Sequence, residues 1–341
     1  MSSDSLPADP RALLTELYWA AVTAAAPGPA LRTALDQHAA SLDHPIHLLA
    51  LGKAAHPMAV AAVEWLAARG REPAGGLLVV PEPAAAPHPA LAVAVGDHPQ
   101  PGMGSLGAAE ALGLAVQRVR PDHEAWVLLS GGTTSLIGAP VAGIAPADLT
   151  TLYRLLLGSG LEITAMNRIR KRFARWAGGR LAAALHPAHV KNFTISDVIG
   201  DDLGSIGSGP CVPDASSAAE VREALGSAGL WDQLPAQLRE HLAAVMRGLL
   251  PETPKPDEPA FAATRTILIA SNRLALEAAC RRAQAAGLEA RVLDSALAGE
   301  AAEVGCRLGA EVVAYDATNV AGAQAGTMNK DTIWVWAGRP P

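Results

Sequence analysis

Short apolar runs alternate with longer amphipathic stretches through most of the 341-residue chain. The runs at 46–51, 75–80, 91–95, 125–129 and 193–196 have the length of β-strands and end in loops rich in glycine, proline or hydroxyl residues. Strands this short, repeatedly separated by helices, are typical of a parallel sheet covered on both faces. The pattern therefore predicts an α/β fold with a mostly parallel, Rossmann-like sheet.

Apolar residues at helical spacing mark the segments between these runs. Residues 10–24 begin with Pro10 and follow Asp9, a good N-cap, so they predict an amphipathic helix. The other helices expected in the first part of the chain are 29–40, one ending at 69, 105–119, 148–158 and 163–185, the last interrupted at its Gly-Gly pair.

The length of the chain favours two domains. Residues 248–259 read GLLPETPKPDEP, a proline- and acid-rich stretch of the kind that separates domains. We therefore expect an α/β domain over 1–250 and a smaller, incomplete α/β domain over 251–341. Within the second part the pattern predicts strands at 265–270 and 290–293, helices at 270–287 and 299–308, and a tail without helical periodicity.

Composition excludes several classes of protein. Half of the residues are hydrophobic and 18% are charged, which is typical of a folded globular chain, and the net charge of −6 disfavours nucleic acid as a partner. No apolar run is long enough to span a membrane, and the polar start MSSDSLPADP does not resemble a signal sequence. The three cysteines, Cys211, Cys280 and Cys306, are widely spaced, which favours reduced thiols and a cytoplasmic location.

Polar loops follow three of the expected strands. Lys53 comes directly after the run at 46–51, and His98 lies in the loop GDHPQP after 91–95. The loop SGGTTSL follows 125–129 and offers two glycines and several hydroxyls to a phosphate. A solvated lysine, an ordinary Gly-Thr turn and a structural histidine are the alternatives. The residues of the third loop that we regard as substrate or phosphate ligands are Ser130, Gly131, Gly132, Thr133 and Thr134.

The densest cation cluster lies between 168 and 180. Arg168, Arg172 and Arg175 are spaced to share one helix face, and no Asp or Glu occurs between Asn167 and Lys191. A solvated face is the usual explanation of such a cluster. Because carboxylates are absent nearby, an anionic ligand is the more attractive interpretation here.

Carboxylates follow the run at 193–196. Asp197, Asp201 and Asp202 lie in a glycine-rich loop, and Mg²⁺ prefers one or two carboxylates together with ligand phosphates. We expect one of the three to cap a turn, and Asp197 to be the functional one.

Together, GKAA at 52–55, GDHPQP, SGGTTSL, the N-R-x-R-K…GGRLA block and SDVIGDDLGSIGSGPCVPD resemble the glycerate 2-kinase family, whose members are often labelled putative hydroxypyruvate reductases. The resemblance covers about residues 10–310. It implies ATP-dependent phosphorylation of D-glycerate to 2-phosphoglycerate with Mg²⁺, between an α/β domain and a smaller, MOFRL-like domain. It further implies a small-molecule substrate as the partner.

The same resemblance assigns roles to individual positions. It places the catalytic lysine at Lys53 and an arginine of the site at Arg170. Asn167 and Lys171 join the loop at 130–134 as substrate or phosphate ligands. Asp197 and Asp201 correspond to the acidic loop and thus to the metal, and a catalytic role of Asp197 as proton acceptor is left open.

The chain also departs from the family. Ala177 stands where a lysine is usual, and neither a Gly-Gly-Glu-Thr-Thr strand nor a Gly-Gly-Arg-Asn loop follows the divergence at about residue 309. Two alternatives therefore stay beside the kinase. One is an NAD(P)H-dependent hydroxypyruvate reductase, although no dinucleotide fingerprint with a downstream acid is recognised. The other is a non-catalytic nucleotide- or anion-binding remnant. The oligomeric state and the true hydroxy-acid acceptor are not predicted.

Overall fold

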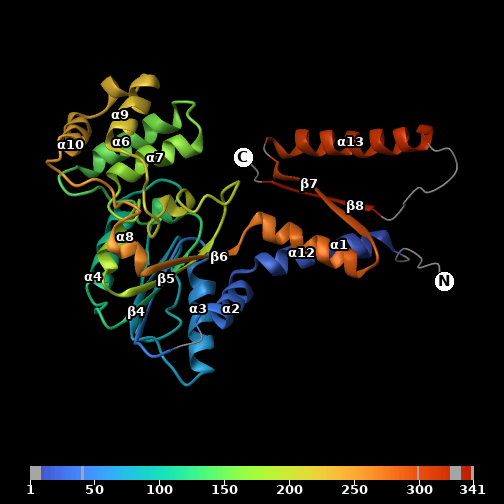
Figure 1. Ribbon diagram of the computed structural model, residues 1–341, viewed down its shortest axis with the longest axis horizontal. Coiled ribbons are helices and arrows are strands. Elements are labelled where there is room, and N and C mark those ends of the chain that lie inside the picture. Colours follow the sequence, from blue (N-terminus) through green and yellow to red (C-terminus); the bar gives the residue numbers. More distant parts are fainter. Residues whose placement is uncertain (1–8, 40–41, 298, 323–331, 339–341) are drawn as a thin grey trace. The chain divides into compact units, whose positions relative to one another are not determined.

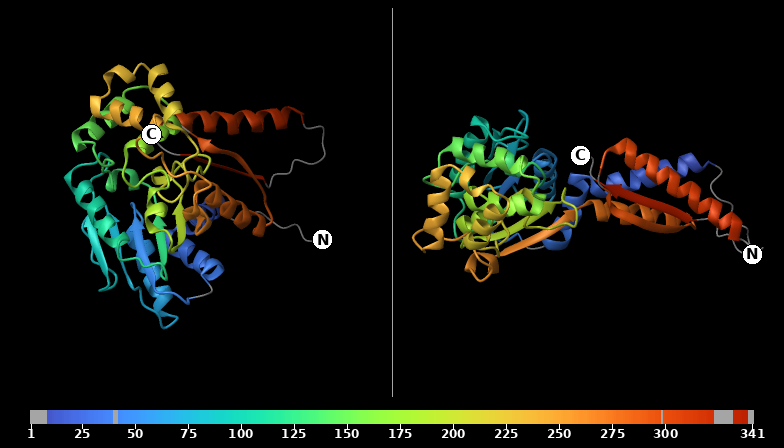
Figure 2. Two further views of the ribbon diagram at one scale, coloured as in Figure 1. Left: turned by 60° about the vertical axis from the view of Figure 1, so that its left-hand side comes forward. Right: turned by 90° about the horizontal axis from the view of Figure 1, so that it is seen from above.

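The computed structural model describes residues 9–39, 42–297, 299–322 and 332–338. Its contacts divide the chain into two units (Figures 1 and 2). The sheet unit comprises 27–198 and 202–269, and the terminal unit comprises 1–26, 199–201 and 270–341.

The sheet unit is built on a six-stranded sheet with the order β3-β2-β1-β4-β5-β6. The pairings of β1 with β2 and β4, of β2 with β3 and of β4 with β5 are all parallel. The predicted α/β fold with a mostly parallel sheet is thus confirmed. The strands are β1 (Ile46–Leu51), β2 (Gly75–Val80), β3 (Leu91–Val95), β4 (Glu124–Leu129), β5 (His189–Ile195) and β6 (Thr264–Ala270).

Alternation along the central strands supplies one core on each face of this sheet. On one face, Leu49 and Val127 pack with Leu112 and Leu181 from the covering helices. On the other face, Trp126 lies fully buried in a cluster with residues of two further helices. Burial on both faces explains why β1 and β4 read as continuous apolar runs. The helices that supply these layers are α2 (Pro27–His38), α3 (Ala55–Ala67), α4 (Met103–Val116) and α8 (Arg180–Leu185).

A helical layer with its own core completes the sheet unit (Figure 1). Leu152, Phe173 and Leu238 are each fully buried in this third cluster. Short elements connect the layers, namely α5 (Thr133–Leu136), η1 (Ile206–Ser208), η2 (Trp231–Gln233) and α11 (Pro259–Ala262). The helices of the layer are α6 (Pro146–Leu157), α7 (Ile163–Phe173), α9 (Ala218–Ser227) and α10 (Ala236–Met246).

The terminal unit joins the two ends of the chain. Leu13 and Leu17 of α1 pack against Ala283 of α12 in a small core. The parallel strands β7 and β8 form a separate two-stranded sheet. The elements of this unit are α1 (Pro10–Ala25), α12 (Asn272–Ala285), β7 (Glu289–Leu297), α13 (Ala301–Gly322) and β8 (Thr332–Gly338).

Two expectations about the second half of the chain differ from the structure. The division lies at 269/270 and not near 250, because β6 extends the first sheet beside β5 and because α1 packs on α12. The tail after residue 308 was also expected to have no helical period. This expectation was wrong, since α13 continues to Gly322. Residues 332–338 form β8, a strand that was not predicted. Both errors concern elements that pack or pair with segments distant in sequence, as α1 does with α12 and β8 with β7.

No helix in the described part of the chain is both long and apolar enough to cross a lipid bilayer.

Two glycines of the sheet unit provide a matched test of this packing. A Cβ at Gly76 would overlap the Leu48 carbonyl oxygen of the neighbouring strand, whereas one at Gly107 in α4 meets nothing within 4 Å. We expect Gly76→Ala to lower the free energy of unfolding by about 1–3 kcal/mol. Gly107→Ala should raise it by about 0.5–1 kcal/mol, because alanine loses less entropy in a helix. Urea unfolding followed by circular dichroism measures both, and a destabilisation by Gly107→Ala equal to that of Gly76→Ala would contradict the packing described.

Candidate active site

The turns that follow β1 and β4 touch each other at the carboxyl edge of the sheet. Gly52 adopts φ +115°, and a Cβ there would overlap both the hydroxyl and the carbonyl of Ser130. The Lys53 amide donates to the Gly131 carbonyl at 2.9 Å, and the Ala54 amide donates to Ser130 Oγ at 3.0 Å. Glycine at position 52 is therefore required for the two turns to meet. Their contact fixes Lys53 beside the loop at 130–134.

The hydroxyls of that loop are mostly engaged within the protein. Thr133 Oγ1 donates to the Ser130 carbonyl at 2.8 Å, and both residues are buried. Thr134 Oγ1 and Ser208 Oγ share a hydrogen bond of 2.9 Å. By contrast, the amides of Gly131 and Gly132 donate no hydrogen bond to any residue that the structure describes. The loop thus offers a ligand two backbone N–H groups more readily than its hydroxyls.

Three ionisable side chains lie close to these two glycines. A Cβ at Gly131 would overlap Asp197 Oδ2, which comes from the end of β5. A Cβ at Gly132 would lie 3.2 Å from Lys53 Cγ and 3.1 Å from His98 Cδ2. Lys53, His98 and Asp197 are all exposed. The structure therefore brings together the predicted residues Lys53, Asp197 and the glycine turn, and we call this group the turn site.

His98 is a residue that sequence reasoning set aside. Its pKa is lowered by burial and by the charge of Lys53, while Asp197 acts in the opposite direction. A lone histidine in a loop carries little signal by itself. The loop GDHPQP follows a strand of a parallel sheet, as the two other polar loops do, so the three loops lie at one edge of the sheet. This common position is the feature of the sequence that could have pointed to His98.

The cation cluster is mainly structural, contrary to the expectation. The helix α7 ends at Phe173, so Arg175 lies outside this helix and does not share a helix face with Arg168 and Arg172. Arg175 forms an ion pair with Glu110 instead. Arg180 donates to the carbonyls of Lys171, Ala174 and Ala177, which ties the chain leaving α7 to the start of α8.

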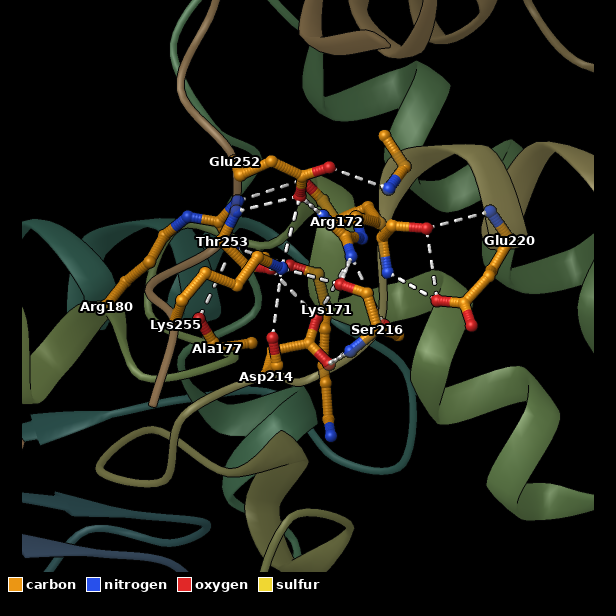
Figure 3. A network of polar contacts seen from close by, with 12 residues as sticks. Lys171, Arg172, Ala177, Arg180, Asp214, Ser216, Glu220, Glu252, Thr253 and Lys255 are labelled. Atoms are coloured by element: carbon orange, nitrogen blue, oxygen red, sulfur yellow. Dashed lines mark hydrogen bonds and ion pairs between the residues drawn. The ribbon is translucent and has the colours of Figure 1, made fainter. Parts of the chain in front are cut away.

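Arg172 lies at the centre of a buried polar network (Figure 3). Its guanidinium forms ion pairs with Asp214, at 3.5 Å, and with Glu252, and its side chain is 2% exposed. Lys255 Nζ donates to the carbonyls of Asp214 and Ser216 at 3.0 and 2.6 Å. The carboxylates that pair with Arg172 thus come from segments far along the chain. They lie outside residues 167–191, the stretch in which the sequence has no Asp or Glu.

Asp214 is the buried carboxylate of this network. Burial alone would raise its pKa, but the hydrogen bond from Ser216 and the charges of Arg172 and Lys171, together with the bond from Thr253, hold that pKa below its ordinary value. The charged form is therefore the stable one in the folded protein.

Three cations of α7 form no ion pair with the described residues, namely the exposed Arg168 and the two predicted site residues Arg170 and Lys171. Burial lowers the pKa of Lys171, opposed by Asp214 and Asp202, and its ammonium forms no hydrogen bond or ion pair with the described residues. Arg170 stacks at 5.0 Å over Tyr153, its Nε is buried without a partner in the described chain, and it donates weakly to Asn167 Oδ1 at 3.4 Å. We call Asn167, Arg170 and Lys171 the α7 site.

The loop at 204–209 connects the two sites. Ser208 bonds Thr134 by its side chain and accepts from the Gly178 amide by its carbonyl. A Cβ at Gly204 would lie 3.2 Å from Lys171 Nζ, so the absence of a side chain leaves room around the ammonium.

The three aspartates of the acidic loop have different environments. Asp202 accepts from the Gly204 amide at 3.2 Å and from Ser205 Oγ at 2.5 Å, which is the turn role expected of one of them. Asp201 adopts φ 55° and lies 3.7 Å from Arg273 Nε within the terminal unit. Asp197 belongs to the sheet unit. In the described residues no group of three or more His, Cys, Asp or Glu side chains is arranged to hold a metal ion.

Comparison with known proteins identifies the family. Residues 13–243 match the model of the "Domain of unknown function (DUF4147)". The chain belongs to the DUF4147 family. The matched residues include strands β1 to β5, helix α7 and the turn site.

Similar DUF4147 chains bear two kinds of name. A "Glycerate 2-kinase" of Pyrococcus horikoshii is 34% identical over 268 residues, which are 78% of this chain and 59% of that protein. A "Glycerate kinase" of Rattus norvegicus is 31% identical over 315 residues, 85% of this chain and 58% of that protein. A "Putative hydroxypyruvate reductase" of Agrobacterium vitis is 37% identical over 67% of this chain and 50% of that protein. The chain therefore spans about half to three fifths of the curated relatives it matches.

Solved structures agree with the fold. A crystal structure of a Pyrococcus horikoshii protein superposes with a TM-score of 0.80 at 29% identity, covering 98% of this chain and 76% of that one. The glycerate kinase of Thermotoga maritima gives a TM-score of 0.80 at 26% identity, covering 98% and 75%. The α/β architecture is thus shared by these proteins.

The buried network predicts unequal costs for two neighbouring arginines. Arg172→Met leaves Asp214 buried without its ion pair and should lower the free energy of unfolding by about 3–5 kcal/mol. Arg175→Met breaks an ion pair whose Glu110 is 69% exposed, so its cost should stay below about 1 kcal/mol. Urea unfolding of both variants measures the difference. Equal costs would show that the Arg172 ion pairs do not form.

The network also predicts a pH dependence of stability. Because the folded-state pKa of Asp214 lies below the unfolded one, its contribution is complete above the unfolded pKa of about 4 and is lost as the pH falls through the folded pKa. Wild-type protein should therefore lose stability below about pH 4 more steeply than Asp214→Asn. Unfolding curves between pH 3 and 7 measure the two slopes, and parallel slopes would contradict the assignment.

Proposed function

We propose that this chain catalyses the phosphorylation of D-glycerate to 2-phosphoglycerate by ATP with Mg²⁺. The observation that carries the proposal is the turn site, where Lys53, Asp197 and two unengaged glycine amides meet at the carboxyl edge of a parallel sheet. Ligands of α/β proteins bind at this edge. The names of the relatives from Pyrococcus horikoshii and Rattus norvegicus, and of the Thermotoga maritima structure, favour this substrate. A cytoplasmic location fits this activity and remains a prediction.

The residues of the turn site fit a phosphate. A Cβ at position 131 would overlap Asp197, and one at position 132 would lie against Lys53 and His98. Only glycine lets an anion approach two successive N–H groups, a known form of phosphate cradle. Lys53 adds positive charge beside it.

Asp197 fits a magnesium ion bound together with a phosphate. Mg²⁺ keeps several waters and needs only one or two carboxylates in addition to the oxygens of the nucleotide. An exposed carboxylate beside the glycine turn meets this requirement without a dedicated cluster of protein ligands. We assign Asp201 a supporting role at most, because it pairs with Arg273.

The α7 site fits the acceptor or the phosphates. Lys171 has an ammonium without a partner in the described chain, and Arg170 has a guanidinium edge without a carboxylate. Cations that form no hydrogen bond or ion pair with a protein carboxylate can bind an anionic ligand. The buried Arg172 holds α7 in place through its ion pairs with Asp214 and Glu252.

ATP, when bound, supplies the phosphoryl group, and Mg²⁺ supplies charge on its oxygens. Catalysis of such a transfer consists mainly of positioning and of neutralising charge that develops on the transferred group. Lys53 and the amides of Gly131 and Gly132 perform these tasks at the turn site. Asn167 orients Arg170 through its hydrogen bond.

One sequence string bears on the reductase alternative. A Gly-x-Gly-x-x-Gly spacing occurs from Gly102 to Gly107. It lies almost wholly inside α4, and a Cβ at Gly102 or Gly104 would approach Asp97 Oδ2 to 2.8 or 3.0 Å. A carboxylate in front of the glycines repels a pyrophosphate, so the string does not support a dinucleotide site.

Kinase activity is tested by coupling ADP formation to an optical assay. Purified protein with Mg²⁺ and ATP should form ADP on addition of D-glycerate, and Lys53→Ala should lower kcat by about 10²–10³-fold through loss of charge stabilisation. Arg118→Ala, at an exposed position away from this edge, should leave kcat unchanged. Absence of ADP formation by wild type would contradict the proposal. NADH oxidation with hydroxypyruvate would then favour the reductase, and ATP binding without turnover the remnant.

A further inference from the structure

We propose that His98 is a further catalytic residue of the turn site and takes the proton of the acceptor hydroxyl through Nε2. This inference rests on the proposed kinase function and adds a proton acceptor to it. Among the predicted residues, that role had been left open for Asp197.

The imidazole edge faces the glycine turn. A Cβ at Gly132 would lie 3.1 Å from His98 Cδ2 and 3.4 Å from Nε2, so this edge of the imidazole lies against the glycine turn. Neither ring nitrogen of His98 makes a hydrogen bond with the residues that the structure describes. A neutral imidazole with a free nitrogen beside a phosphate cradle is suited to accept a proton from a bound hydroxyl.

The backbone on both sides of His98 is fixed. Before it, Asp97 accepts from the Ser105 amide at 3.0 Å, and the Asp97 amide donates to Ser105 Oγ at 2.9 Å. After it, the Pro99 carbonyl accepts from Ser135 Oγ at 2.6 Å. Ser135 belongs to α5, which begins at the glycine turn. The loop is therefore anchored to the same turn that His98 faces, while the imidazole is left without a structural bond.

The surroundings favour the neutral imidazole. Burial and the charge of Lys53 lower its pKa, and Asp197 is the one acidic group that raises it. Asp97, the carboxylate of its own loop, is engaged with Ser105. A histidine whose pKa lies below its ordinary value is mostly unprotonated at neutral pH and ready to act as a base.

The step balances as follows. The acceptor O–H bond breaks and its proton moves to His98 Nε2, while the hydroxyl oxygen forms a bond to the γ-phosphorus of the nucleoside triphosphate. The bond from that phosphorus to the β,γ-bridging oxygen breaks, and the nucleoside diphosphate leaves with its electron pair. The imidazolium then releases its proton to water. Lys53 offsets negative charge at the same place.

The test is the pH profile of kcat for wild type and His98→Asn. Wild type should lose activity at acidic pH as the imidazole becomes protonated, whereas the variant should lack this acidic limb. At neutral pH, His98→Asn should lower kcat by about 10²-fold or more, the range of general-base catalysis, and change KM for the acceptor less than threefold by our expectation. His186→Asn is the matched control, because His186 is exposed and also precedes a proline. It should behave as wild type.

The outcomes separate this inference from the proposed function. An active wild type with an unchanged kcat and acidic limb in His98→Asn overturns the role of His98 and leaves the kinase standing. A rise in KM with kcat unchanged also overturns it, because His98 would then only bind. If wild type has no kinase activity, NMR titration of His98 still tests the geometry. Its pKa should rise in Lys53→Met, and an unchanged pKa would contradict the placement.

Discussion

The close contact between the turns after β1 and β4 is the constraint on which the candidate site depends. Gly52 leaves no room for a side chain against Ser130, and the Lys53 amide bonds the Gly131 carbonyl. Because both strands are parallel neighbours, their carboxyl ends meet, and the contact sets a lysine beside two amides that have no partner in the described chain. Asp197 and His98 arrive at the same place from two other strand ends.

A second constraint decides which cations of α7 are available. Arg172 is buried with Asp214 and Glu252, Arg175 pairs with Glu110, and Arg180 binds backbone carbonyls. Removing a partner from a buried ion pair is costly, so this network holds α7 in one position. Its remaining cations, Arg168, Arg170 and Lys171, are then the ones that an anionic ligand can meet. Some cations of the cluster therefore stabilise the fold, and the others are available to a ligand.

The sequence predicted what depends on local pattern and missed what depends on distant partners. Apolar runs located β1 to β5, and strand-end loops located Lys53 and the glycine turn. Arg172 was misjudged because its carboxylates lie 42 and 80 residues further along, outside any local window. The position of β6 beside β5 and the strand β8 were missed for the same reason. His98 was set aside because only folding brings it to Gly132.

We propose that the glycine turn receives the phosphoryl group in transfer. Calorimetric titration of wild type and Gly132→Ala with Mg·ATP and with 2-phosphoglycerate measures this role, since each ligand carries that group. The added methyl group, placed against Lys53 and His98, should weaken the binding of both ligands at least about tenfold, or 1.4 kcal/mol, in protein that unfolds cooperatively. Unchanged affinity for both ligands in such a folded variant would contradict it.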